Sequence, residues 1–168
     1  LNGRSIDFTA FRETTMILDH RLIFSEAQDI GQVAGSYPSS NYYDNGVAQT
    51  APGGYGTIEK DIFKGDMGKM VFLISIIEAV TSAGAATIDF QVVQATDSAL
   101  TTSVDVLQST GPIAYTALTA GKRIHLSPPA AGLTKRYWGL RYVVAGATTT
   151  AGTVTASLVR NVDTGLAT

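Results

Sequence analysis

Apolar and polar residues alternate along most of this chain with the two-residue period of β-strands. The stretch 68–80, GKMVFLISIIEAV, is apolar on both faces of the expected pleat. One face carries Phe72, Ile74 and Ile76, and the other carries Val71, Leu73 and Ile77. A strand with this pattern is usually covered on both sides. We therefore expect it at the centre of a sheet.

A second clear signal follows in 85–97, where Ile88 and Phe90 alternate with Asp89 and Gln91 as in a half-exposed antiparallel strand. Shorter strands are expected at 16–24, 57–63, 104–107, 113–118 and 122–126. Two β-branched and aromatic runs near the C-terminus predict a hairpin, with its strands within 135–146 and 152–163. Helical periodicity is nearly absent. The pattern predicts an all-β fold, a jelly roll or β-sandwich of about six to eight antiparallel strands.

Two segments fall outside this strand pattern. Residues 1–15 form an expected N-terminal arm, too short to make its own core, with apolar side chains at Ile6, Phe8 and Phe11. Residues 31–56 are rich in Gly, Ser, Asn and Pro and are expected to form one long loop. This loop carries Tyr37, Tyr42, Tyr43 and Tyr55. The predicted organisation is thus an arm at 1–15 and a single domain at 16–168.

Composition narrows the classes of function. The 168 residues carry 12 Lys and Arg against 14 Asp and Glu, a net charge of −2, and the basic residues are scattered. A nucleic-acid partner is not expected, because phosphate neutralisation needs several cations on one face. The chain has no cysteine, which excludes disulfides, Cys-based zinc sites and thiol nucleophiles. The longest apolar run, 70–77, is too short to cross a bilayer, and charges in the first fifteen residues do not fit a signal peptide. We expect a soluble protein made in the cytosol, without a membrane partner.

Residues able to carry chemistry are sparse. The only histidines are His20 and His125, and neighbours such as Asp19 and His20 point to opposite faces of a strand. The carboxylates lie singly, without the spacing of a metal site, so neither a catalytic centre nor a metal or other cofactor is expected. Trp138 lies in a strand signal with apolar alternate positions, which favours a core role over a sugar-binding platform.

Several pieces together resemble the cement (capsid-decoration) protein family of tailed bacteriophages, the Bordetella phage cement protein family. Each piece is a generic strand with its turn, and their order along the chain carries the resemblance. They lie at 16–28, 58–80, 88–97, 120–129 and 137–159. The last piece, YWGLRYVVAGATTTAGTVTASLV, is the most distinctive. The arm at 1–15 and the length of the 31–56 loop depart from the family pattern.

The resemblance implies a non-enzymatic jelly roll on the outer surface of an icosahedral head, which bridges major capsid proteins and stabilises the shell. The implied partners are the major capsid protein and the protein itself, as a homodimer in preference to a trimer. Hypothetical contact residues are the apolar arm residues and loop tyrosines named above. Replacing Tyr42 and Tyr43 by Ala is expected to lower capsid occupancy without unfolding the domain. The alternative is a carbohydrate- or receptor-binding β-sandwich on the virion surface, such as a head fibre or adhesion module.

Overall fold

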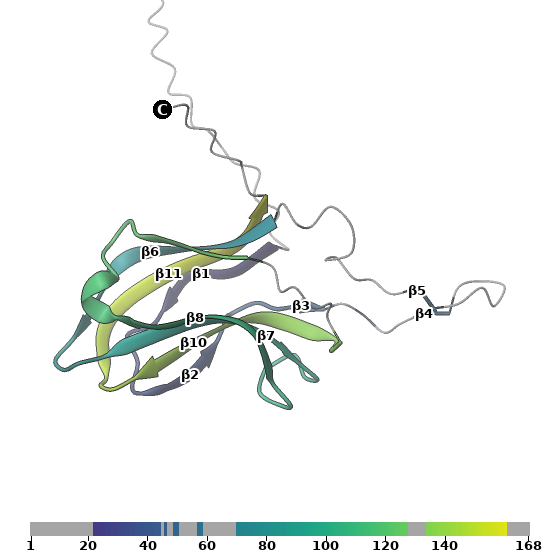
Figure 1. Cartoon of the computed structure of the whole chain (residues 1–168), viewed down its shortest axis with the longest axis horizontal. Coiled ribbons are helices and arrows are strands. Elements are labelled where there is room, and N and C mark those ends of the chain that lie inside the picture. The colour runs from purple at the N-terminus through teal and green to yellow at the C-terminus, as the bar shows by residue number, and fades with distance from the viewer. Residues whose placement is uncertain are drawn as a thin grey trace, which may run out of the picture.

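The computed structural model describes residues 22–44, 46, 49–50, 57–58, 70–127 and 134–160. Their regular structure is almost entirely antiparallel β-strand, with one short 3-10 helix, η3, at Tyr115–Ala117. Two packed sheets make up the fold (Figure 1). The predicted all-β sandwich is confirmed.

The first sheet has the strand order β1-β11-β6-β9. Its strands are β1 (Ile23–Asp29), β11 (Thr149–Arg160), β6 (Met70–Ser82) and β9 (Arg123–Leu126). The second sheet has the order β2-β10-β7-β8, and β3 also pairs with β10. Its strands are β2 (Gly35–Pro38), β3 (Tyr43–Asp44), β10 (Tyr137–Ala145), β7 (Thr87–Ala95) and β8 (Asp105–Ala114). A separate two-stranded ribbon pairs β4 (Gln49–Thr50) with β5 (Thr57–Ile58).

Most consecutive strands of the sandwich lie in different sheets, which makes this a jelly roll. The predicted C-terminal hairpin is therefore wrong. β10 pairs with β2, β3 and β7 in the second sheet, whereas β11 pairs with β1 and β6 in the first. At the crossing between the sheets Gly146 has φ +80°, a left-handed conformation that glycine adopts without strain. Each strand takes an inner position in its own sheet and thereby satisfies both of its backbone edges.

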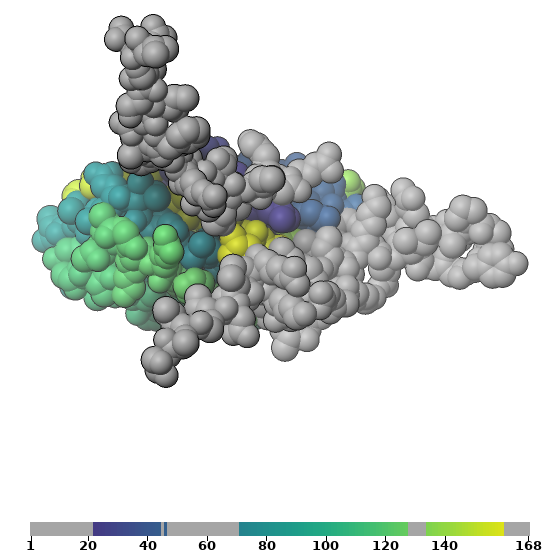
Figure 2. Space-filling model, turned by 90° about the horizontal axis from the view of Figure 1, so that it is seen from above, coloured from purple at the N-terminus to yellow at the C-terminus, as the bar shows by residue number. Residues whose placement is uncertain are grey.

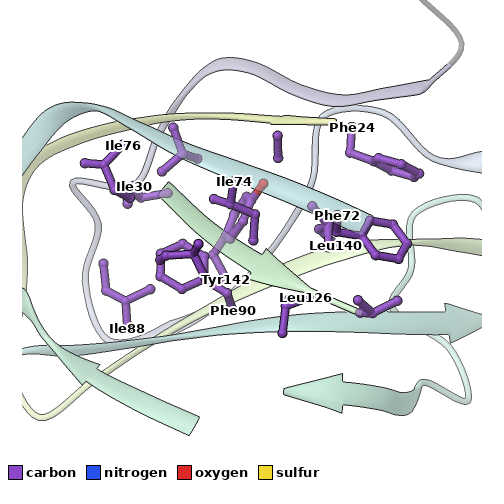
Figure 3. Close-up of a cluster of buried hydrophobic side chains, with 14 of the residues drawn as sticks. Phe24, Ile30, Phe72, Ile74, Ile76, Ile88, Phe90, Leu126, Leu140 and Tyr142 are labelled. Carbon is purple, nitrogen blue, oxygen red and sulfur yellow. The ribbon is translucent and has the colours of Figure 1, made fainter. Parts of the chain in front are cut away.

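The core lies between the two sheets (Figure 3). Inward-facing side chains alternate with outward ones along most of β10 and the first half of β7, as two packed sheets require. The largest fully buried side chains include Trp138, Tyr142, Phe24, Phe72 and Phe90. Three of them stack together, because the Trp138 ring lies 5.1 Å from Phe24 and 5.7 Å from Phe72. The core role predicted for Trp138 is confirmed.

The strand predicted at 68–80 is β6, and its central position is confirmed. The expectation that both of its faces are covered is wrong. Phe72, Ile74 and Ile76 are buried, but Ile77 on the other face is 54% exposed. The sandwich has only two layers, so each sheet turns one face to the core and the other away from it.

The segment 31–56 is not one long loop. β2 and β3 lie within it and extend the edge of the second sheet beside β10. Its polar and glycine-rich composition did not indicate these two strands, because a strand at the edge of a sheet can expose polar residues to solvent. Of the strand expected at 16–24, residues 16–21 lie outside the described residues. The observed strand β1 begins only at Ile23 and runs to Asp29 through an irregular pairing with β11, so the prediction overlaps it at two residues. The signals at 104–107 and 113–118 belong to one strand, β8, followed by η3.

Candidate functional site

The candidate site lies at one end of the sandwich. The antiparallel pairing places here the start of β1, the end of β3, the start of β6, the end of β9, the start of β10 and the end of β11. The opposite end consists of the tight connections at 31–34, 83–86 and 146–148, together with η3. Figure 2 shows that opposite end as a continuous surface of β6 in teal and the η3 region in green.

An aromatic–arginine patch lies at this end, where β3 ends and β10 begins, and consists of Tyr42, Asp44, Arg136 and Tyr137. The side chain of Tyr42 is 46% exposed. Its ring meets that of Tyr137 edge to face, with centroids 5.4 Å apart and planes at 83°. The Arg136 guanidinium carbon lies 4.9 Å from the centroid of the Tyr137 ring, a cation–π contact. The patch therefore joins two aromatic rings and a cation at the surface.

An ion pair holds this arginine in place. Arg136 Nε donates to Asp44 Oδ1 at 2.7 Å, and Arg136 Nη2 donates to Asp44 Oδ2 at 2.8 Å. These hydrogen bonds to Asp44 raise the pKa of Arg136 above its ordinary value. Asp44 is itself oriented by the Gly46 amide, which donates to Oδ1 at 2.8 Å. The two-pronged geometry fixes the plane of the guanidinium against the Tyr137 ring.

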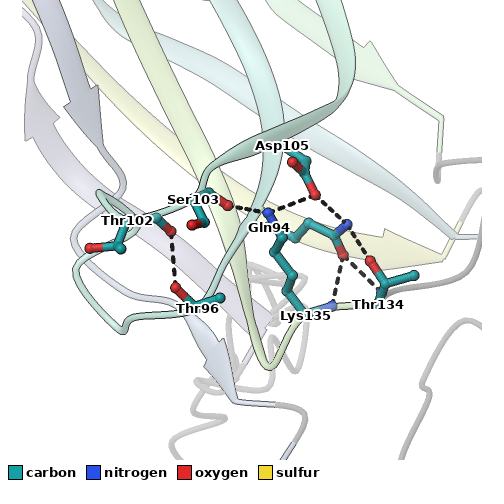
Figure 4. A network of polar contacts seen from close by, with 7 residues as sticks. All are labelled: Gln94, Thr96, Thr102, Ser103, Asp105, Thr134 and Lys135. Atoms are coloured by element: carbon teal, nitrogen blue, oxygen red, sulfur yellow. Dashed lines mark hydrogen bonds and ion pairs between the residues drawn. The ribbon is translucent and has the colours of Figure 1, made fainter.

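A polar network supports the patch from the neighbouring strands (Figure 4). Lys135 pairs with Asp105 at 2.8 Å and also donates to the Ser103 carbonyl. The hydrogen bond from Lys135 lowers the pKa of Asp105. Gln94 donates to Asp105 at 3.2 Å and to Thr134 Oγ1 at 2.9 Å, and its carbonyl accepts from the amides of Thr134 and Lys135. The start of β10 is thereby tied to β7 and β8.

The β7–β8 connection folds back over the outer face of the second sheet. Leu100 is 2% exposed and forms a small second cluster with Val93 and Ala95. Asp97 holds the connection in shape by accepting from the amides of Thr101 and Thr102. The hydrogen bond from Thr102 is the largest cause of the lowered pKa of Asp97. Tyr137 packs against this cluster, so the patch rests on an ordered base.

The predicted contact tyrosines have different surroundings. Tyr37 packs against the core, and its hydroxyl donates to the Val33 carbonyl at 2.9 Å. Tyr43 also packs against the core, with its ring 5.1 Å from Trp138. Because that ring packs within the sandwich, we now expect replacement of Tyr43 to cost stability, so Tyr42 alone offers a clean test of the predicted contact. Of the three described loop tyrosines, Tyr42 is the most exposed, and its contact with a capsid stays a prediction.

Other predicted residues lie outside the described part of the chain, namely Ile6, Phe8, Phe11, His20 and Tyr55. His125 is described and lies exposed on β9. In the described ranges no three His, Asp or Glu side chains gather as metal ligands would. Those ranges also hold no helix long and apolar enough to span a membrane.

Sequence reasoning missed Asp44, Arg136 and Tyr137 as surface residues. The pairing of β3 with β10 sets Asp44 opposite Tyr137 and Tyr43 opposite Trp138. This pairing joins segments more than ninety residues apart, which no local pattern reports. The available signal was the Arg-Tyr pair directly before a buried strand position, since arginine and tyrosine are enriched at interface hot spots.

Chemically, the patch is suited to binding. Tyrosine and arginine provide large, oriented contact area together with hydrogen-bond donors. Curated proteins gave no match to this chain. Among known protein families, residues 24–158 match the family described as Bbp16, well over half of the chain. The match begins at Phe24 in β1 and ends at Leu158 in β11, two buried residues of neighbouring strands, and so spans the sandwich. The chain belongs to the Bbp16 family, whose name suggests a Bordetella phage protein.

Proposed function

We propose that this protein is a structural virion protein that decorates and cements an icosahedral phage head. It would bind the outer surface of the capsid, bridge neighbouring major capsid proteins and stabilise the shell, acting by binding and not by catalysis. It would reach the virion after synthesis in the host cytoplasm. The observation that carries the proposal is the family match. It covers residues 24–158, which span the jelly roll, and the name of the family suggests a phage protein.

The geometry of the patch supports a binding role at one end of the sandwich. Tyr42 is exposed, and Tyr137 and Arg136 are held beside it by the ion pair to Asp44. A rigid anchor loses little conformational entropy on binding, which favours contact residues that are already ordered. If one molecule contacts several capsid subunits of the lattice, its weak contacts combine into a high overall affinity. We therefore assign the patch to the capsid-facing side.

Co-sedimentation with empty heads tests this proposal. Purified full-length protein is mixed with heads assembled from the major capsid protein of the same phage, and bound protein is measured against total protein. We expect saturation at a fixed ratio to the capsid subunit. The thermal stability of the heads is expected to rise with occupancy, because a ligand that binds the assembled shell stabilises it.

Matched variants locate the contact. Tyr42→Ala removes an exposed ring from the patch and is expected to weaken binding roughly tenfold, as for a hot-spot residue. Val33→Ala is the control, since Val33 is 62% exposed at the opposite end of the sandwich. Heads that leave wild-type protein in the supernatant would contradict the cement role. Equal binding by Tyr42→Ala and Val33→Ala would show that the capsid contact does not lie at the patch.

A second candidate function is binding of a carbohydrate or host receptor on the virion surface. The observation that favours it is the exposed Tyr42 ring near the Asp44 carboxylate, because aromatic faces and carboxylates recur in sugar sites. Retention of the protein on a glycan array or on host cells, with no binding to heads, would establish this role instead. Loss of that retention in Tyr42→Ala would place the sugar site at the patch.

A further inference from the structure

A second surface feature lies on the outer face of the second sheet, away from the patch. Arg141 in β10 and Gln91 in β7 are direct cross-strand partners, and Gln91 also faces Ser109 in β8. Tyr142 and Phe90, their neighbours along the chain, are fully buried. The side chains of Arg141 and Gln91 therefore point outward. Arg141 itself is half-buried.

These residues form a continuous hydrogen-bonded row. Arg141 Nε and Nη2 both donate to Gln91 Oε1, at 2.9 Å and 2.6 Å. Gln91 Nε2 donates to Asp89 Oδ2 at 2.6 Å. Ser109 Oγ donates to Asp89 Oδ1 at 2.7 Å, and Thr110 Oγ1 donates to the same oxygen at 3.1 Å. The row runs across three strands and ends on the arginine.

The row fixes the direction of the arginine. The Asp89 carboxylate only accepts hydrogen bonds, so the amide nitrogen of Gln91 must face it. The carbonyl oxygen of Gln91 is then turned toward Arg141. Two hydrogen bonds to one oxygen hold the guanidinium plane, and they use two of its five N–H donors. The arginine is thus oriented by a neutral group.

Arg141 forms no direct ion pair in the described part of the chain, and it is linked to the Asp89 carboxylate only through Gln91. The ion pairs found there are Lys135 with Asp105 and Arg136 with Asp44. Three guanidinium donors remain after the bonds to Gln91. The cross-strand neighbours of the row are apolar on one side, since Pro38 pairs with Arg141, and Val143 follows on the same face. An oriented cation beside apolar side chains matches the make-up of an interface hot spot.

We propose that Arg141 is a recognition point for a carboxylate side chain of a partner protein. A carboxylate accepts two parallel hydrogen bonds from a guanidinium, which the three remaining donors can supply. The inference does not depend on the capsid role, because it concerns only the protein carboxylate that meets the free donors of Arg141. It adds a second contact surface, on the face of the sheet, to the patch at the end.

A titration followed by NMR tests the site on full-length protein. The probe is an acetylated and amidated hexaglutamate peptide at low ionic strength, with hexaglutamine as the uncharged control. Binding is read from the arginine Nε–Hε signals and from the backbone amides of Gln91 and Val143. We expect saturable shifts of Arg141 with hexaglutamate and none with hexaglutamine. Arg123, exposed on β9 of the other sheet, is an internal comparison in the same spectra.

Two variants separate geometry from net charge. Arg141→Lys keeps the positive charge but loses the planar fork, and we expect binding about tenfold weaker. Arg123→Gln removes a positive charge elsewhere and should leave the Arg141 shifts unchanged. Backbone spectra of both variants report whether the fold is retained. Shifts that follow Arg123, or that persist unaltered in Arg141→Lys, would overturn the assignment, as would the absence of any saturable shift at Arg141.

Discussion

The hydroxyl of Tyr142 forms a buried contact between the two sheets, and removing it is a sharp test of the core. Tyr142 in β10 is fully buried, and its oxygen lies 2.7 Å from Ser25 Oγ in β1. Ser25 also donates to Gln28 Oε1 at 2.6 Å, so the tyrosine is the donor in the contact with Ser25. Tyr142→Phe removes this donor and leaves Ser25 with an acceptor for its own proton. The change therefore isolates one hydrogen bond.

The expected cost at neutral pH follows from this geometry. A buried hydrogen bond contributes about 1 to 1.5 kcal/mol, and the loss leaves one lone pair of Ser25 unsatisfied. The ring of phenylalanine retains the packing against Phe90, whose centroid is 5.7 Å away. We expect Tyr142→Phe to lower the free energy of unfolding by about 1.5 kcal/mol at pH 7.

The same residue predicts a dependence on alkaline pH. Burial raises the pKa of Tyr142, and the hydrogen bond with Ser25 opposes this only in part. Above about pH 10 the unfolded chain releases the phenolic proton while the folded chain keeps it. The unfolded state then binds fewer protons, so stability falls as pH rises, by about 1.4 kcal/mol per unit for this group. Tyr142→Phe lacks this loss, and the two stability curves should cross near about pH 11.

Urea denaturation followed by circular dichroism between pH 7 and about pH 11.5 measures both effects, with the free energy taken from linear extrapolation. Tyr42→Phe is the control, because Tyr42 is 46% exposed. It should leave the stability at pH 7 unchanged. Parallel curves for wild type and Tyr142→Phe would refute the buried, proton-retaining tyrosine. Equal stability at pH 7 would refute the hydrogen bond.

Three further predictions concern the turns and the patch. Gly146→Ala should lower the free energy of unfolding by about 3 kcal/mol or more in urea denaturation, because Gly146 has φ +80° and an added Cβ would lie 2.3 Å from the Ala85 carbonyl oxygen. The control Gly121→Ala should lower it by only about 1 kcal/mol, because Gly121 has φ +83° but an added Cβ would meet nothing within 4 Å. Equal losses in the two variants would contradict the predicted steric clash at Gly146. Asp97→Asn should speed hydrogen exchange at the Thr101 and Thr102 amides at pH 6, because the carboxylate accepts hydrogen bonds from both. The folded state lowers the pKa of Asp97, so the stabilisation by this carboxylate is present above about pH 4 and is lost as the pH falls further. Exchange rates that respond neither to the substitution nor to pH would argue against these hydrogen bonds. Tyr43→Ala should lower stability by about 3 kcal/mol through lost packing on Trp138, whereas Tyr42→Ala should change it by less than about 1 kcal/mol, and the reverse order would overturn the placement of the two rings.

The candidate site was predictable only in part. The tyrosine-rich segment pointed to contact residues, and Tyr42 is exposed at the surface. Its neighbours Tyr37 and Tyr43 carry the same chemistry, and the sequence could not separate them from Tyr42. The face of a side chain in a short edge strand depends on register, and the pairing with β10 sets it here. The Arg141 row likewise depends on three strands that are adjacent only in the folded chain.

From the sequence alone one can predict the all-β class, the long central strand and the burial of Trp138. These follow from the alternation of apolar positions and from β-branched and aromatic composition, which are local properties. Strand pairing, in contrast, could not be predicted in this way. β10 and β11 are consecutive and each looks like half of a hairpin, yet they lie in different sheets. Alternation of apolar and polar residues shows that a strand has one buried face, but it does not show which strand pairs with it. The jelly-roll strand order, and the surfaces built across several strands, therefore arise from the packing of the whole chain.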